Sequence, residues 1–483
     1  MDWGMFQAGL PYLILTTGLI VLMVGVSIHR SHQVAWSLTV LTLIATFISH
    51  FFVYEAVATD IVVITELFRV DSIAYFFNAV FLLATLVLVL FAQVFLDRRT
   101  KFTEEFYVLI LAATLGAMML PASTHFASLI LGLEVISISL YALIAYPDHA
   151  RPPLEAGLKY LVLSGVGTAT LLMGMAFIYA ASGNLDFSSI HITDGSMEGE
   201  ILFLIGNTLF WCGIAFKLSL VPFHIWTPDV YHGAPSVVTA FLATVSKGAV
   251  FAVVLRYVIE ADILSSDTIS NAIMLIACAS MVIGNLLALL QNNLKRLLAY
   301  SSIAHMGYLL IVVFLISVNT SLGYESALFY LVSYFVMTLA AFGVIIALSS
   351  KSETEVDTLN GISGLLWTKP AAGAVLIAAA LSLAGIPLTV GFFAKYYLFT
   401  AGISEGMWPL VVCLVLGSGL GIFYYVRIIF RTLEKPQEEL SVSVPWLGLS
   451  ITVLLALAII VFGLYPTPLV DLIRAILVFP PTL

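Results

Sequence analysis

The sequence predicts an all-α, polytopic membrane protein with about fourteen transmembrane helices, and three observations support this prediction. Hydrophobic residues make up 61% of the 483 residues, charged residues make up only 10%, and the mean hydropathy is +1.09. A soluble domain carries about 25% charged residues, so no soluble fold could bury this much apolar surface. Apolar runs of about 20 residues, the length that crosses a bilayer, recur along the whole chain.

The apolar runs set the expected helix boundaries. The fourth run ends at Pro121, since proline removes a backbone donor, and no connecting segment is long enough to form a soluble domain. The stretch before the first run contains Asp2 but no basic residue, unlike a cleaved signal, so we expect the first helix to be retained. The expected spans are 10–28, 34–53, 72–96, 106–120, 125–146, 154–182, 201–223, 236–260, 270–290, 297–318, 323–349, 371–401, 408–431 and 444–464.

The basic residues predict the orientation of these spans. Assigning alternate loops to opposite sides leaves only Arg69, Arg256 and Arg474 on one side. Lysine and arginine are enriched in cytoplasmic loops, so the richer side is expected to be cytoplasmic and both termini periplasmic, in a bacterial inner membrane. The richer side receives Arg30, Arg98, Arg99, Lys101, Arg151, Lys295, Arg296, Lys351, Lys369, Arg427, Arg431 and Lys435.

Two function classes fit poorly. The net charge of -9 does not suggest a nucleic-acid partner, which requires clustered basic residues. Cys212, Cys278 and Cys413 lie in separate apolar runs, far apart in sequence. Their spacing matches neither a disulfide framework nor a zinc or iron–sulfur site, so we expect no cofactor in this chain.

Five ionisable residues remain inside the apolar runs: Glu134, Lys159, Lys217, Lys247 and Lys395. Each charge at the bilayer centre costs about 2.5–3.5 kcal/mol on insertion scales, so such residues are functional candidates by default. Structural explanations exist beside the functional one. Lys159 could reach outward to the interface, Lys217 and Lys395 could bond carbonyls freed at nearby helix breaks, and Lys247 could form an inert ion pair.

Glu134 is the expected counter-charge of Lys217, either as a structural pair or as part of a proton pathway. Burial favours a neutral lysine and a nearby carboxylate favours a charged one, so such a pair can switch a lysine between holding and releasing a proton. His305 and Tyr308 add a candidate relay, since histidine exchanges protons near neutral pH. A hydrogen-bonded packing role for His305 is equally compatible. His224 is a secondary candidate at a helix break, and both it and His232 are expected near the cytoplasmic surface.

An internal repeat is suggested by two proline-containing motifs, LSLVPF from Leu218 and LSLAGIP from Leu381. They fall in the seventh and twelfth expected helices. A repeat of five helices places its second copy upside down in the membrane. Inverted repeats with broken helices at corresponding positions are typical of transporters, whose ion sites lie at the breaks.

Three longer motifs carry a family resemblance that extends over essentially the whole chain. KLSLVPFHIWTPDVYHGAP from Lys217, NLKRLLAYSSIAHMGYLL from Asn293 and LSLAGIPLTVGFFAKYYLF from Leu381 resemble the antiporter-like membrane subunits of respiratory complex I. Within that family, Lys395 and the short stretch after the last span favour the subunit type that lacks a lateral helix at its C-terminus. The resemblance implies inverted repeats formed by helices 4–8 and 9–13, with helices 7 and 12 discontinuous.

The resemblance also implies roles and partners. Glu134 and Lys217 match the pair that controls proton intake, Lys247 the central lysine, His305 the connecting histidine, and Lys395 the lysine that exchanges protons with the outside. Lys159 matches a further buried basic position. FMN, iron–sulfur clusters and quinone would belong to partner subunits, and neighbouring antiporter-like subunits and lipids would surround the chain. The expected divisions are 1–105, 106–260, 261–431 and 432–483.

Three alternatives remain open at this point. A subunit of a multi-subunit sodium/proton antiporter would share the ancestry and the lysines, and partner subunits that reduce quinone would distinguish the two. A quinone-binding redox subunit is disfavoured by the absence of paired haem-type histidines and of a cysteine cluster. An independent carrier of small solutes would need an organic substrate site, which the sequence cannot reveal.

Overall fold

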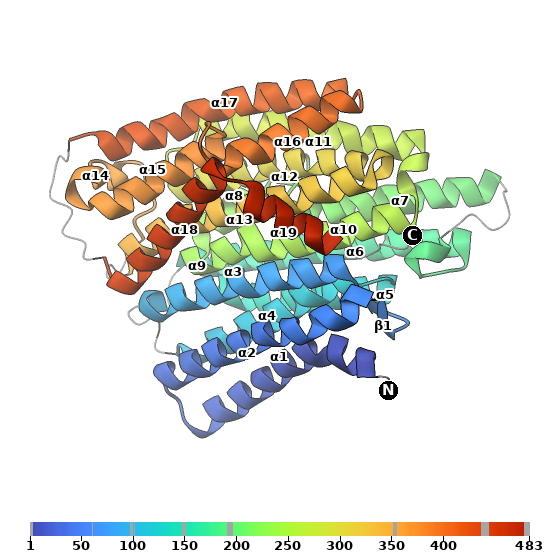
Figure 1. The fold of residues 1–483 in the computed structure, drawn as a ribbon, viewed down its shortest axis with the longest axis horizontal. Helices are drawn as coiled ribbons and strands as arrows, with labels where there is room; N and C mark the ends of the chain where they lie inside the picture. The colour runs from blue at the N-terminus through green and yellow to red at the C-terminus, as the bar shows by residue number, and fades with distance from the viewer. Residues whose placement is uncertain are drawn as a thin grey trace.

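The computed structural model describes residues 3–59, 61–96, 100, 102–146, 151–190, 197–350, 355–435 and 444–477. Most of the long helices run roughly along one direction and pack side by side, as Figure 1 shows. The first half of the chain contains α1 (Trp3–Ile28), α2 (His32–Thr59), β1 (Val62–Thr65), β2 (Phe68–Val70), α3 (Ser72–Leu96), α4 (Glu104–Ala122), α5 (Phe126–Ile144), α6 (Arg151–Ser182), α7 (Met197–Leu218), α8 (Trp226–Gly233), α9 (Ser236–Phe241) and α10 (Lys247–Glu260).

The remaining described elements are helices and short helical turns. Short 3₁₀ turns lie at Phe187–Ser189, Ile263–Ser265 and Asn360–Ile362, and a π-helical turn, Leu242–Ser246, joins α9 to α10. The helices are α11 (Asp267–Leu289), α12 (Leu294–Val318), α13 (Thr320–Ser349), α14 (Leu365–Thr368), α15 (Pro370–Ala384), α16 (Val390–Ser404), α17 (Trp408–Leu433), α18 (Trp446–Leu464) and α19 (Thr467–Leu477).

The predicted membrane fold is confirmed. In the described ranges, 13 helices are long and apolar enough to cross a membrane, or up to 14 when a bent pair counts as one span. The span predicted at 371–401 is divided into α15 and α16, each 15 residues long. Four residues assigned to the basic side, Arg98, Arg99, Lys101 and Lys351, lie outside the described residues.

The start of α1, the end of α19 and the two-stranded sheet lie toward one end of the bundle, which we call the hairpin end (Figure 1). Strands β1 and β2 pair antiparallel there, with Val62 opposite Val70. The other end, called the opposite end, holds the link between α8 and α9 and the start of α12. Helix α19 is short and amphipathic, and Arg474 on it donates two hydrogen bonds, of 2.8 and 3.0 Å, to Glu325 on α13.

Two spans are broken, at the two places where the sequence predicts breaks. Helix α7 ends at Leu218, and Ser219 then takes a positive φ of 63° before Pro222. Helix α15 ends at Ala384, and the next residue, Gly385, has a φ of +81°, which suits glycine because it has no Cβ. Helix α7 runs away from the hairpin end and α15 runs toward it, so the two breaks are inverted relative to each other (Figure 1).

Close backbone contact between α6 and α7 depends on glycine. A Cβ at Gly174 would lie 2.5 Å from the backbone nitrogen of Phe210 and 2.6 Å from the carbonyl oxygen of Gly206. Backbone atoms cannot move aside as a flexible side chain can. Small residues therefore allow these two membrane helices to approach each other, as in other helix pairs in lipid.

We expect Gly174→Val to destabilise the protein, since overpacking a tight contact costs about 1–3 kcal/mol or more. The measurement is the temperature at which half of the purified protein is lost from its size-exclusion peak. Gly165→Val is the matched control, because a Cβ at Gly165 on the same helix meets nothing within 4 Å. Equal unfolding temperatures for the two variants would contradict the proposed close contact.

Candidate functional site

The first polar group lies where α5, α6 and α7 meet. Lys217 is 7% exposed, and its ammonium donates hydrogen bonds to the hydroxyls of Ser137 at 2.8 Å and Ser164 at 2.9 Å. Thr168 on α6 donates to the carboxylate of Glu134 at 2.9 Å. Ser137 lies one turn from Glu134, and Ser164 one turn from Thr168, so each helix presents both partners on one face.

The expected direct pair of Glu134 and Lys217 is not formed. Within the part of the chain that the structure describes, no ion pair of 4.0 Å or less joins them, because the ammonium binds hydroxyls one turn away from the carboxylate. Tyr141 also donates to Ser164, at 3.1 Å. The carboxylate and the amine are thus separated by hydroxyl groups, which can both accept and donate a proton.

A small enclosed cavity lies between Lys217 and Lys247. Both lysines line it, together with Ser137, Ser246 and Tyr160. The volume within this cavity that the centre of a water molecule can occupy is about 10 Å³. This is close to the smallest volume that holds one water. The two lysines therefore share a site at which a single water could connect them.

Lys247 begins α10, immediately after the π-helical turn, in the span Ser236–Glu260, which is buried on all sides. The side chain is 1% exposed and donates to the hydroxyl of Ser302 on α12 at 2.5 Å. Its ammonium also lies 5.4 Å from the ring centroid of Tyr231, within the range of cation–π attraction. π-Turns inside helices are frequent at functional sites, and this one fixes the position of the lysine.

His305 lies one turn further along α12 and uses both ring nitrogens. Nδ1 is 2.7 Å from the hydroxyl of Tyr330 on α13, and Nε2 is 3.4 Å from the hydroxyl of Tyr425 on α17. Tyr425 is in turn hydrogen-bonded to Ser301. The imidazole is 1% exposed, so these hydroxyls are its hydrogen-bonding environment within the described residues.

Lys395 lies on α16 beside the break before that helix. Its ammonium donates to the carbonyls of Leu383 and Ala384, both at 3.0 Å, which are left free at the end of α15. The negative end of the α15 dipole stabilises the cation. The ammonium is also 5.3 Å from the ring centroid of Tyr308, which places Tyr308 between His305 and Lys395.

Taken in order, the buried groups form a row that crosses both halves of the bundle. Lys217 and Lys247 share a cavity, Lys247 contacts the helix that carries His305, and Tyr308 links that helix to Lys395. Each group is an amine, an imidazole or a hydroxyl, so each can hold or pass a proton. Within the described residues, no group of three or more histidine, cysteine, aspartate or glutamate side chains is placed to hold a metal ion.

Two predicted residues lie apart from this row. Lys159 is not buried, since 42% of its side chain is exposed, and it forms ion pairs with Glu155 at 2.8 Å and Asp229 at 3.0 Å. This corrects the expectation of a buried basic group, and the reason is its position near the start of α6. His224 lies between α7 and α8 with its ring 6.4 Å from that of Tyr300.

A cluster at the hairpin end was assigned wrongly from the sequence. Arg256 was counted with the charges of the basic-poor side and not among the buried charges, but it lies on α10 with 5% exposure. Its guanidinium donates to Asp71 at 2.9 Å and to Glu260 at 3.2 Å, and Arg69 also binds Glu260. Two basic and two acidic groups neutralise one another here. The sequence signal was the spacing of four between Arg256 and Glu260 on one helix face.

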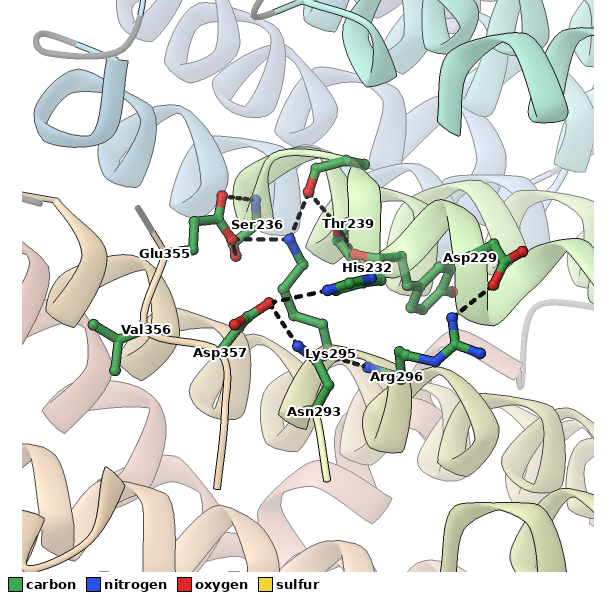
Figure 2. A network of polar contacts seen from close by, with 12 residues as sticks. Asp229, His232, Ser236, Thr239, Asn293, Lys295, Arg296, Glu355, Val356 and Asp357 are labelled. Carbon is green, nitrogen blue, oxygen red and sulfur yellow. Dashed lines mark hydrogen bonds and ion pairs between the residues drawn. The ribbon is translucent and has the colours of Figure 1, made fainter. Parts of the chain in front are cut away.

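A second missed cluster lies at the opposite end and appears in Figure 2. Lys295, expected at the surface, is 2% exposed and donates to Glu355 at 2.9 Å and to the carbonyl of Ala234 at 2.6 Å. Glu355 also accepts the backbone N–H of Ser236 at 3.1 Å. Asp357, two residues further, accepts from Asn293 at 2.7 Å. The segment after α13 is thereby fastened to α9 and α12.

We expect Glu355→Ala to destabilise this end strongly, because it leaves the buried Lys295 ammonium without its carboxylate. Breaking a buried pair from one side costs about 3–5 kcal/mol. The matched control is Glu155→Ala, which removes one partner of the more exposed Lys159 and should cost about 0–1 kcal/mol. The measurement for both variants is the temperature at which half of the purified protein is lost from its size-exclusion peak. Similar decreases of this temperature in the two variants would contradict the structural role of Glu355.

The fold and the row of buried basic groups define a multi-pass membrane protein of the antiporter type. A family model described as "NADH:quinone oxidoreductase/Mrp antiporter, TM" matches residues 123–421. A protein named NADH-quinone oxidoreductase subunit N, from Methylococcus capsulatus, is 45% identical over 484 residues, covering 100% of this chain and 97% of that protein. The chain therefore belongs to the family of antiporter-like subunits shared by NADH:quinone oxidoreductases and Mrp antiporters.

Solved structures agree with this family. A chain of respiratory complex I from Thermus thermophilus superposes with a TM-score of 0.82 at 30% identity, covering 96% of this chain and 99% of that one. A chain of an archaeal membrane-bound sulfane sulfur reductase gives 0.84 at 24% identity, covering 97% and 96%. A chain of the Mrp complex from a Dietzia species gives 0.84 at 19%, covering 100% and 98%. The last two show the shared fold alone.

Proposed function

We propose that this chain is the N-type proton-translocating membrane subunit of a bacterial NADH:quinone oxidoreductase. The observation that carries the proposal is the row of buried proton-holding groups that joins the two broken helices through the middle of the bundle. A buried row of ionisable groups costs free energy in a membrane protein, and such groups are functional candidates by default. The 45% identity to a protein named subunit N supports this assignment over the whole chain.

The proposed roles follow the order of the groups. Glu134 and Lys217 control proton intake into the first half, Lys247 receives the proton at the centre, His305 passes it on, and Lys395 exchanges it with the far side. Burial favours a neutral amine, whereas a nearby carboxylate favours a charged one. A change in the spacing between Glu134 and Lys217, now bridged by hydroxyls, would therefore shift Lys217 between holding and releasing a proton.

The auxiliary residues lie where the path would begin and end. Tyr308 lies between His305 and Lys395, so we assign it to the transfer between them. Lys159 pairs with Glu155 and Asp229 at the opposite end, and we assign it to the entry side of the first half. We give His224 no separate role, because its ring contacts Tyr300 and none of the relay residues.

The proposed setting follows from the family and from the charge distribution. The opposite end carries the basic residues, including Arg30, Arg296 and Arg431, so we place it in the cytoplasm and both termini in the periplasm of the inner membrane. The partners are other subunits of the oxidoreductase, in particular neighbouring antiporter-like subunits. FMN, iron–sulfur clusters and quinone are assigned to those partners. We retain the division at residues 105, 260 and 431 as the proposed limits of the repeats.

The test is to purify the protein gently from its native membrane and to identify its partners while assaying NADH-driven quinone reduction. Flavin- and iron–sulfur-bearing partners together with this activity are the expected result. A preparation that contains only antiporter-type membrane subunits and no redox activity would instead favour a cation/proton antiporter. Redox activity that depends on quinone bound within this chain would favour the third candidate, a quinone-binding subunit.

A further inference from the structure

Lys247 and His305 are consecutive members of the row of buried groups, but no direct hydrogen bond connects them in the described part of the chain. Lys247 donates to Ser302, and His305 follows Ser302 by three residues on the same helix. In the described part of the chain, no hydrogen bond joins Ser302 to His305. Both ring nitrogens of His305 bind tyrosine hydroxyls on other helices. A proton that leaves Lys247 therefore needs further groups to reach the imidazole.

Helix α13 presents three hydroxyl residues beside this gap: Tyr330, Tyr334 and Thr338. Their spacing of four places them on one face of the helix, with a rise of about 6 Å from each to the next. They are 0%, 1% and 4% exposed, respectively. Tyr330 binds His305, and the ring of Tyr334 lies 5.2 Å from the imidazole ring. Ser302, the partner of Lys247, is also a neighbour of Tyr334.

Two of these hydroxyls have no hydrogen-bond partner among the described residues, namely those of Tyr334 and Thr338. An unsatisfied buried hydroxyl costs about 1–3 kcal/mol, so folded proteins normally satisfy such groups with bound water. A water that binds there would have several polar neighbours, as buried waters require. Tyr334 is a neighbour both of Ser302 and of the imidazole ring, and Thr338 lies one turn from Tyr334 on the same face of α13.

We propose that the hydroxyls of Thr338, Tyr334 and Tyr330, bridged by bound water, relay protons between two ends. Lys247 and its partner Ser302 form one end, and His305 forms the other. Each hydroxyl oxygen accepts a proton from one side as it releases its own proton to the other. An N–H bond of the Lys247 ammonium breaks, each hydroxyl forms one O–H bond as it breaks another and keeps its charge, and an N–H bond forms on the imidazole of His305. The relay deepens the proposed function and rests on it.

The test uses the whole purified complex in proteoliposomes, with NADH and a short-chain quinone, and follows proton uptake and quinone reduction together. Tyr334→Phe keeps the ring against His305 and removes only the hydroxyl, and Thr338→Val keeps the side-chain shape. Neither hydroxyl has a hydrogen-bond partner among the described residues, so assembly and thermal stability should be unchanged. We expect the double variant to take up protons about tenfold more slowly, equivalent to about 1.4 kcal/mol at the barrier, with a larger solvent isotope effect in D₂O.

Two controls separate the relay from a structural role. Ser333→Ala removes a buried hydroxyl on the same helix that donates to the carbonyl of Phe329 at 2.7 Å, and it should keep full uptake. Thr338→Ser retains the hydroxyl and should also keep full uptake. Undiminished uptake in the double variant, while Lys247→Met loses uptake in the same assay, would overturn the relay and leave the proposed function intact. Undiminished uptake in Lys247→Met as well would overturn the proposed function itself.

Discussion

Replacing Lys247 by methionine is expected to lower NADH-driven proton uptake by about a hundredfold, the lower end of what a positioned proton-transfer group contributes. Lys247 lines the cavity shared with Lys217 and also donates to Ser302 on the helix that carries His305. Methionine has similar length but cannot hold a proton. The variant complex should still assemble, since the change removes one hydrogen bond, to Ser302, and also removes the cost of burying an amine.

The measurement is proton uptake by proteoliposomes that contain the purified complex, normalised to the amount of assembled complex. Lys435→Met is the matched control, because Lys435 is exposed beyond the end of α17 and should have no effect on uptake. Loss of the complex from the membrane in Lys247→Met would favour a structural role for the lysine. Normal assembly with normal uptake would remove Lys247 from the pathway.

Replacing Lys395 is the second change with a large expected effect, and arginine is the more informative substitution. The ammonium binds two carbonyls at the end of α15, so a purely structural role is a real alternative. Arginine keeps the positive charge and can bind both carbonyls, but it does not release its proton in a protein. We therefore expect Lys395→Arg, like Lys395→Met, to lose proton uptake by about a hundredfold.

A structural role predicts the reverse order of the two variants. If Lys395 only stabilises the break, arginine should restore uptake and thermal stability, and methionine should lower both. Gly385 makes the contact feasible, since a Cβ there would lie 2.8 Å from Cδ of Lys395. Thermal stability and proton uptake are therefore measured together. A proton-exchange role predicts that Lys395→Arg keeps its thermal stability but loses uptake, whereas a structural role predicts that it keeps both.

The sequence alone predicted the membrane class, the spans and the two breaks. These features depend on local properties: apolar runs of spanning length, and prolines that cannot continue a helix. It also selected Lys217, Lys247 and Lys395, because a lysine inside an apolar run is expensive wherever it points. The count of buried charges was less accurate. Arg256 and Lys295 were left out of the buried charges, and Lys159 was expected to be buried.

The errors share one physical reason. Position along a helix gives the depth of a residue in the membrane but not the direction in which it faces, so burial near a helix end depends on which neighbour packs there. Lys295 is buried because the segment after α13 returns across it, and Arg256 because Asp71 and Glu260 meet it from the start of α3 and the end of α10. The contacts of Lys295 with Glu355 and of Arg256 with Asp71 join separate segments of the chain, and only the contact of Arg256 with Glu260 lies within one helix.

The sequence by itself determined that this chain crosses a membrane many times, carries lysines at buried depths and breaks two helices in inverted positions. Only the tertiary structure decided that Glu134 and Lys217 are separated by hydroxyls, that one cavity joins Lys217 to Lys247, and that a π-turn fixes the position of Lys247. The free energy of transferring an apolar segment into the membrane and the effect of proline on a helix are properties of each segment by itself. They can therefore be predicted from the sequence, one segment at a time. Contacts of a few ångströms depend on how separate helices pack against one another.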